Sequence, residues 1–294
     1  MEQKHIHFII NESSDSENVE SIIDELFEQH SLSYHVSRLK NHADIAALAQ
    51  QMKASRMVAV YGGDGTVTEV AKVLIGTEVP LAIIPGGTAN VLSKELQIPQ
   101  DTISAIKMLA EDSFQIKNMD TGLVNGTSFL LRVNLGIMAD MITDVNPTVK
   151  EHAGQLAYGL SAIKAVSNAE PHTYQLIIDG EAMEVSAVSL TVTNSGHMGI
   201  GNLQMHPGIS VTDGLLDLVL LKNADVLTLV KAAGSSLMDK ETEAVNHYPL
   251  KKINIKMSQP ESYICDDCEA NADELTIEVV PSSLRVVVPL THNE

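Results

Sequence analysis

The chain has 294 residues, of which 44% are hydrophobic, so it can bury a substantial core in one large domain or two smaller ones. It carries 19 Lys and Arg against 38 Asp and Glu, and this formal charge of −19 argues against general binding to nucleic acids or anionic membranes. Aromatic residues make up only 3%, so stacking surfaces for single strands are not expected either. We therefore predict no nucleic-acid partner.

The N-terminal residues, the apolar runs and the cysteines lead us to expect an intracellular protein. The first residues lead directly into an apolar run without the flanks of a signal peptide, and no apolar run is long enough to span a bilayer. Cys265 and Cys268 lack the second pair that a zinc site needs and are too few for a disulfide framework. We expect a cytoplasmic protein with non-ligating cysteines.

The first part of the chain alternates strands and helices. Apolar runs predict strands at 5–10, 34–39, 57–61 and 81–84, and helical periodicity predicts helices near 19–27, 45–52, 68–75, 89–96 and 102–111. This order predicts a parallel sheet flanked by helices, with the loops that follow the strands at the carboxyl edge, where such folds bind ligands.

The pattern changes near Asp120 to many short strands. These are expected at 128–135, 173–179, 183–194, 215–222, 250–257, 275–280 and 284–289, with helices near 155–168 and 224–238. We expect a mostly antiparallel β-sandwich. The predicted domains are 1–122 and 123–294, with the last strand allowed to return to the first domain and a ligand cleft between them.

Two glycine-rich loops follow neighbouring strands. Residues 62–66 read GGDGT, and residues 85–90 read PGGTAN. Glycines let the backbone N–H groups approach phosphate oxygens closely, and Asp64 suits such a loop if Mg²⁺ lies between carboxylate and phosphates. The alternative is a tight turn in which Asp64 caps the next helix. Two such loops at one sheet edge favour the phosphate site.

These motifs resemble a known family. GGDGTVTEV followed by PGGTANVLSKELQIP is similar to the diacylglycerol-kinase-type catalytic domain of bacterial lipid kinases, which are related to sphingosine and ceramide kinases. The similarity continues through MDTGLVNG, NLGIMADM, TNSGHMGIGN, TDGLLDLVLL and CDDCEA. It implies an NAD-kinase-like α/β domain followed by a β-sandwich. It also implies transfer of the γ-phosphoryl group of ATP, with Mg²⁺, to the hydroxyl of a diacylglycerol-like or sphingoid-like lipid.

The resemblance also implies site residues. The nucleotide would contact Asn11, Ser37, Gly62, Gly63, Asp64, Gly65, Thr66, Val67, Thr68, Gly87, Thr88 and Asn90. The family's Asp-Gly-Glu motif reads Asp267-Cys268-Glu269 here, so Asp267 and Glu269 would supply the base and its support, in an order left open. Asp64 and Asp120 would join the Mg²⁺ network. The alternatives are an acidic surface hairpin at 265–274 and a turn residue at Asp120.

A structural metal loop is implied as well. Relatives bind an ion through one Asp and two flanking oxygens, which correspond to Ser210, Asp213 and Leu215. Leu215 can offer only its carbonyl oxygen, which suits a hard ion such as Mg²⁺. An Asp-Gly turn leading into the following strand explains the same residues equally well.

The chain departs from the family at several positions. The loop at Asn11 lacks the family's Pro and Gly, Thr68 replaces an Asn of many relatives, and Val91 stands where diacylglycerol kinases have Asp. Cys268 replaces Gly, and we expect strain if the backbone there needs a positive φ.

Three functions remain open at this point. The first is a lipid kinase that contacts the membrane transiently and peripherally, with lipid substrate and homodimerisation unspecified. The second is an NAD kinase-like phosphotransferase, although the second loop lacks that family's pattern. The third is a catalytically weak nucleotide- or lipid-binding protein, which the departures favour.

Overall fold

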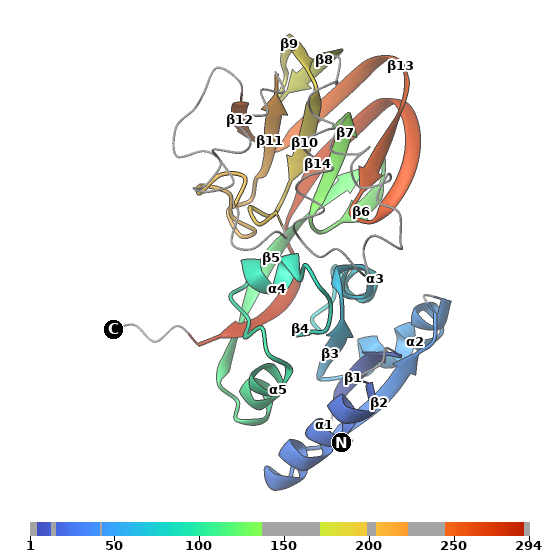
Figure 1. The fold of residues 1–294 in the computed structure, drawn as a ribbon, viewed down its shortest axis with the longest axis vertical. Helices are drawn as coiled ribbons and strands as arrows, with labels where there is room; N and C mark the ends of the chain where they lie inside the picture. Colours follow the sequence, from blue (N-terminus) through green and yellow to red (C-terminus); the bar gives the residue numbers. More distant parts are fainter. Residues whose placement is uncertain are drawn as a thin grey trace. The chain divides into compact units, whose positions relative to one another are not determined.

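The computed structural model describes residues 5–12, 16–41, 43–136, 171–198, 204–222 and 245–290 (Figure 1). The chain divides into two compact units, Met1–Met119 with Ser282–Glu294, and Asp120–Pro281. The units therefore separate within two strands, one that contains residues 119 and 120 and one that contains residues 281 and 282. The domain boundary predicted between residues 122 and 123 stays a prediction. Among the described residues, none of the helices combines the length and apolarity that crossing a bilayer requires.

The N-terminal unit is a parallel sheet with helices between its strands. Its strands are β1 (Ile6–Asn11), β2 (Tyr34–Leu39), β3 (Met57–Gly62) and β4 (Leu81–Pro85). Its helices are α1 (Ser16–Gln29), α2 (Ala43–Ala54), α3 (Asp64–Leu74), α4 (Val91–Glu95) and α5 (Thr102–Ala110). The strands lie in the order β2-β1-β3-β4, and all pairs are parallel. The α/β fold predicted for this part is confirmed.

The core of this unit follows from the apolar pattern. Every residue of β3 and β4 is buried, which explains their continuous apolar sequences. On one face of the sheet, the ring of Phe8 in β1 meets the ring of Phe27 in α1 edge to face, with centroids 5.0 Å apart. The periodic apolar residues of α1 thus pack on the sheet as the sequence predicts.

The C-terminal unit is mostly antiparallel. Its strands are β5 (Phe114–Val124, shared with the first unit), β6 (Thr127–Phe129), β7 (Arg132–Gly136), β8 (His172–Ile178), β9 (Glu181–Ala187), β10 (Ser189–Thr193), β11 (Leu216–Leu221), β12 (Val245–Leu250), β13 (Lys252–Cys265) and β14 (Cys268–Pro289, also shared with the first unit). The run β12-β11-β10-β7-β13-β14 pairs antiparallel throughout, and the β8–β9 hairpin pairs with β13. The predicted β-rich fold is confirmed.

Several predicted strand limits are wrong. The run 183–194 is two strands, β9 and β10, and 128–135 is divided between β6 and β7 by Leu130 and Leu131. The runs 275–280 and 284–289 are one strand, because β14 continues through Pro281 and Ser282. The strand predicted at 250–257 covers the last residue of β12 and the first part of β13. The strand β5 was not predicted, because polar residues interrupt its apolar pattern. The helices expected at 155–168 and 224–238 lie outside the described residues.

Candidate functional site

The two glycine-rich loops meet at the carboxyl edge of the parallel sheet. Gly62 at the end of β3 lies beside Pro85 at the end of β4, and the Gly86 N–H donates to the Gly62 carbonyl at 3.0 Å. A Cβ placed on Gly87 would lie 2.6 Å from the Cα of Gly63. The loops therefore touch backbone to backbone, as the sequence predicts, and a side chain at residue 87 would separate them.

Asp64 and Asn90 brace these loops. Asp64 is the first residue of α3, and its Oδ1 accepts the Leu92 N–H of α4 at 3.3 Å. Asn90 is left-handed, with φ 48°, and its amide accepts from the Gly87 N–H at 3.0 Å and donates to the Gly87 carbonyl at 2.9 Å. Thr88 between them is exposed. Asp64 thus makes a capping contact to α4, whereas Thr88 is exposed together with Gly86 and Gly87.

The remaining nucleotide candidates lie at different depths. Asn11 at the end of β1 donates from Nδ2 to Thr66 Oγ1 at 3.2 Å, which joins the first strand to the start of α3. Thr66, Val67 and Thr68 are buried in that helix. Ser37 in β2 shares a 2.8 Å hydrogen bond with His7 Nε2. The structure thus brings Asn11 and Thr66 together and pairs Ser37 with a histidine; the nucleotide contacts of these residues stay predictions.

Asp120 organises a loop of the C-terminal unit. Its side chain is 1% exposed, and Oδ2 accepts the Gly214 N–H at 2.7 Å while its own N–H donates to the Val211 carbonyl at 2.7 Å. Asp120 therefore holds the 211–214 segment in place, which is more than the simple turn residue that the sequence also allowed.

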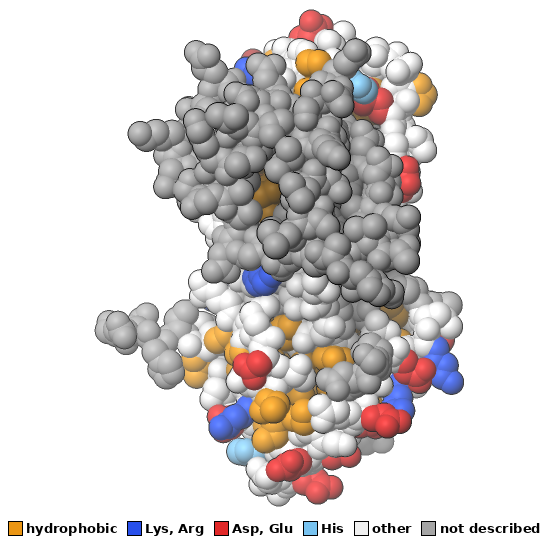
Figure 2. All heavy atoms as spheres, in the orientation of Figure 1, with side chains coloured by type: hydrophobic (Ala, Val, Ile, Leu, Met, Phe, Trp, Pro, Cys, Tyr) orange, Lys and Arg blue, Asp and Glu red, His pale blue; other side chains and the backbone are white. Residues whose placement is uncertain are grey.

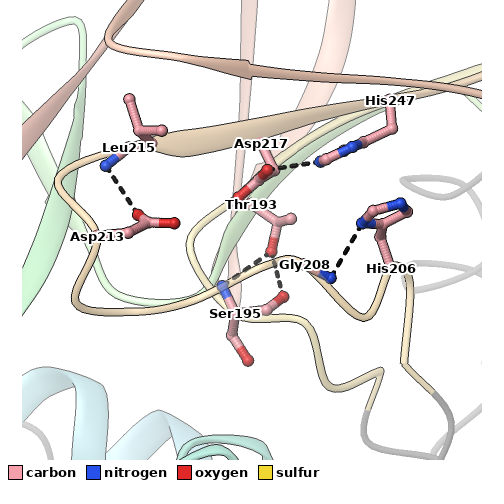
Figure 3. Close-up of polar contacts among 8 residues, drawn as sticks. All are labelled: Thr193, Ser195, His206, Gly208, Asp213, Leu215, Asp217 and His247. Carbon is pink, nitrogen blue, oxygen red and sulfur yellow. Dashed lines mark hydrogen bonds and ion pairs between the residues drawn. The ribbon is translucent and has the colours of Figure 1, made fainter.

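The predicted metal loop, residues 210–215, contains the carboxylate of Asp213 (Figure 3). Asp213 Oδ1 accepts the Leu215 N–H at 3.0 Å, and Ser210 Oγ lies 3.2 Å from Thr212 Oγ1. Burial raises the pKa of Asp213, and the charges of Asp217 and Asp120 raise it further. The hydrogen bond from the Leu215 N–H to Asp213 is that of an Asp-Gly turn. This turn therefore does not depend on a bound ion.

A buried carboxylate beside this loop was not predicted. Asp217 Oδ1 lies 2.6 Å from His247 Nε2, and the rings of His206 and His247 stack with centroids 4.0 Å apart. Asp217 Oδ2 is buried with no hydrogen-bond partner among the described residues. No described group of three or more His, Cys, Asp or Glu side chains is arranged to hold a metal. The ligand set expected from the sequence, the Asp213 carboxylate with an oxygen of Ser210 and the carbonyl of Leu215, therefore stays a prediction.

The hairpin between β13 and β14 carries the other candidates. Asp266 and Asp267 form its two-residue turn, because Cys265 pairs with Cys268. Asp267 and Glu269 are exposed, and Ser262 Oγ donates to Glu269 Oε1 at 2.7 Å. The left-handed residue of the turn is Asp266, with φ 51°, whereas Cys268 is the first residue of β14. The condition for strain at Cys268, a positive φ, is therefore not met, because that position lies in the strand and not in the turn.

Family models match both units. The model of the diacylglycerol kinase catalytic domain matches residues 5–124, and that of the YegS C-terminal NAD kinase beta sandwich-like domain matches residues 132–288. An uncharacterized protein of Synechocystis sp. is 29% identical over 79% of this chain, which spans 54% of that relative's length. A Bacillus subtilis protein named diacylglycerol kinase is 28% identical over 72% of this chain and 70% of its own.

Solved structures agree with the sequence relatives. A structure described as "a putative diacylglycerol kinase from Bacillus anthracis str. Sterne" covers 98% of this chain and 97% of its own, with 25% identity and a TM-score of 0.84. The paired glycine loops, the two-unit fold and the two family models point the same way. This chain belongs to the diacylglycerol kinase-like family of lipid kinases.

Proposed function

We propose that this protein is an ATP- and Mg²⁺-dependent lipid kinase that transfers the γ-phosphoryl group to the hydroxyl of a diacylglycerol-like or sphingoid-like lipid. The observation that carries the proposal is the contact between the 62–65 and 86–90 loops in a chain of this family. Backbone N–H groups at glycine-rich loops and at the start of α3 suit the phosphates of ATP.

The proposed chemistry needs a base and charge neutralisation. Asp267 or Glu269 takes the proton of the lipid hydroxyl, the hydroxyl oxygen forms a bond to the γ-phosphorus, and ADP leaves. Both carboxylates are exposed, and the hydroxyl of Ser262 restrains Glu269. A bound Mg²⁺ would supply positive charge at the phosphates, and Asp64 and Asp120 are the residues whose carboxylate oxygens we propose would hold it.

We also propose a structural ion at the loop of Ser210, Asp213 and Leu215. The raised pKa of Asp213 and the buried, unpartnered Oδ2 of Asp217 indicate negative charge that an ion would neutralise. All the candidate ligands are oxygens, which fits Mg²⁺. The lipid substrate implies a transient, peripheral contact with the membrane surface.

The NAD kinase-like alternative has one specific observation in its favour. The C-terminal family model is described as NAD kinase beta sandwich-like. NAD is therefore included as a competing acceptor. Strain at Cys268 no longer supports the alternative of a weak binding protein. The replacement of the family's Asp by Val91, which is buried at the start of α4, still supports it.

The decisive experiment measures transfer from radiolabelled ATP in mixed micelles, with and without Mg²⁺. The acceptors are diacylglycerol, monoacylglycerol, ceramide, sphingosine, phosphatidylglycerol and NAD. We expect label on a lipid only with Mg²⁺, and a loss of about 100-fold or more in Asp267→Asn because the amide cannot accept the proton. Asp273→Asn, an exposed acid further along β14, is the matched control and keeps wild-type turnover.

Three results would contradict the proposal. Label on NAD alone supports the rival kinase. ATP binding without label on any acceptor supports the binding protein. Full turnover in both Asp267→Asn and Glu269→Gln removes the hairpin from the reaction. Full turnover in Asp267→Asn alone does not contradict the proposal and assigns the role of base to Glu269.

A further inference from the structure

Three hairpin turns of the C-terminal unit share one feature. Each has two residues, and the first is a left-handed Asn or Asp: Asn125, Asp179 and Asp266, with φ of 47°, 48° and 51°. Asn and Asp tolerate this conformation better than other residues that carry a Cβ. The three turns join β5 to β6, β8 to β9, and β13 to β14.

In each turn this residue docks on a neighbouring segment by a reciprocal pair of hydrogen bonds. The N–H of Asn125 donates to the Thr276 carbonyl at 2.9 Å, and its Oδ1 accepts the Thr276 N–H at 2.8 Å. The N–H of Asp179 donates to the Lys252 carbonyl at 2.9 Å, and its Oδ1 accepts the Lys252 N–H at 2.8 Å. The N–H of Asp266 donates to the Arg132 carbonyl at 2.8 Å, and its Oδ1 accepts the Arg132 N–H at 3.1 Å.

The turn at Asp266 differs from the others in three ways. Its carboxylate accepts two further N–H groups, of Leu130 at 3.0 Å and Leu131 at 2.9 Å, whereas that of Asp179 accepts one further N–H, of Lys251 at 3.1 Å. Asp266 is 8% exposed, whereas Asn125 and Asp179 are exposed. Glycine follows Asn125 and Asp179, with φ of 84° and 98°, but Asp267 follows Asp266. The most strongly anchored turn is thus the one that presents an exposed carboxylate in place of glycine.

We infer that Asp266 is a positioning residue that fixes the turn bearing Asp267 and Glu269. This inference rests on the proposed lipid-kinase function. A carboxylate that accepts three backbone N–H groups in a buried position is held in one orientation and is poorly suited to take a substrate proton. Its role is to hold the adjacent Asp267 in place, since displacements of about 1 Å at a reacting group can lower turnover about 100-fold.

The test compares Asp266→Asn with Asp179→Asn. Asn keeps the left-handed preference and Oδ1, but its NH₂ group replaces Oδ2 and opposes the N–H of Leu130 at the first site and of Lys251 at the second. Both variants lose one charge from the same kind of turn. Asp179 belongs to no proposed catalytic or binding group, so it is the matched control.

We expect Asp266→Asn to lower kcat by about 10- to 100-fold with the KM for ATP within about twofold, because the reacting group moves but the nucleotide loops do not. Asp179→Asn keeps kcat within about twofold. Hydrogen exchange at the amides of residues 130–132 becomes faster in Asp266→Asn only. Asp266→Gly, which tolerates the left-handed backbone without opposing N–H groups, repeats the loss if Asp266→Asn fails to fold.

Equal loss of kcat in Asp266→Asn and Asp179→Asn overturns the inference, because the effect is then general. Wild-type kcat in Asp266→Asn together with faster exchange at 130–132 also overturns it, since the anchor is then broken without consequence. A wild-type protein that labels no acceptor defeats the proposed function itself, and the inference with it. These outcomes separate the two failures.

Discussion

His7 shows how one buried residue can set the response to pH. It is fully buried in β1, its Nε2 is bonded to Ser37, and its Nδ1 has no partner among the described residues. Its ring lies 5.0 Å from that of His35 and 6.5 Å from that of His5. Burial, followed by the charges of His35 and His5, lowers the pKa of His7 from 6.5 to about 4.

This shift predicts loss of stability in acid. Because the unfolded chain binds a proton at this residue below pH 6.5 and the folded chain only below about pH 4, the free energy of unfolding decreases as the pH falls through this window. The loss is complete below about pH 4 and amounts to about 3 kcal/mol. Urea unfolding between pH 7 and 4 measures it.

The matched variant for this prediction is His7→Leu, which cannot titrate. We expect its stability to decrease less over the same pH range, by the contribution of His7. Parallel curves for the two proteins would show that the acid sensitivity comes from other groups.

At the scale of elements, the contact between two loops defines the proposed nucleotide site. The Cβ of an alanine at residue 87 would lie 2.6 Å from Gly63 Cα, whereas one at residue 63 would lie 3.4 Å from Gly87 Cα, an ordinary van der Waals distance. Parallel pairing of β3 with β4 brings the loops to this distance.

We expect Gly87→Ala to destabilise the protein by about 1–3 kcal/mol and to abolish ATP binding, because backbone atoms must move. Gly63→Ala should keep the unfolding temperature of the wild type and weaken ATP binding alone, because its methyl group would lie in the proposed phosphate-binding loop. Calorimetry of unfolding and ATP titration distinguish the two effects. Equal unfolding temperatures for both variants would contradict the contact.

At the scale of the whole molecule, the N-terminal unit is completed by the end of the chain. In the last part of β14, Val286 pairs with Leu81 of β4, and Leu284, Val287 and Val288 are buried. Arg285 Nη1 also donates to the Glu78 carbonyl at 2.9 Å. The unit that holds the glycine loops therefore needs residues about 200 positions later in the sequence.

Truncation after Pro281 tests this dependence. We expect loss of ATP binding and of cooperative unfolding in the N-terminal unit, although every proposed nucleotide residue is retained, because β4 loses its neighbour and buried apolar area. Truncation after Leu290 keeps β14 and serves as the control. Unchanged ATP binding after Pro281 would show that the return strand is dispensable.

Charge acts at this same scale. Figure 2 shows Lys and Arg side chains interspersed among Asp and Glu over the described part of one face. Together with the net charge of −19, this gives no electrostatic support for binding to an anionic surface on the face shown.

The apolar and glycine patterns of the sequence were sufficient to predict the fold class and the position of the two glycine-rich loops. Period-2 and period-3.6 apolar patterns are local, so β1 to β4 and their helices could be predicted within a few residues. Glycines between a buried strand and a helix predicted which loops would meet, because parallel strands end at one sheet edge.

The strand limits and contacts of the C-terminal unit could not be predicted, because they depend on tertiary contacts. The strand β14 runs unbroken through Pro281, and residues 114–124 form the strand β5. Both features depend on neighbours that are distant in the chain. Asp266 and Asp267 are equivalent in sequence, as adjacent acids in one polar stretch. The structure separates them, because the amides of residues 130–132 reach only Asp266 and hold it buried while Asp267 stays exposed.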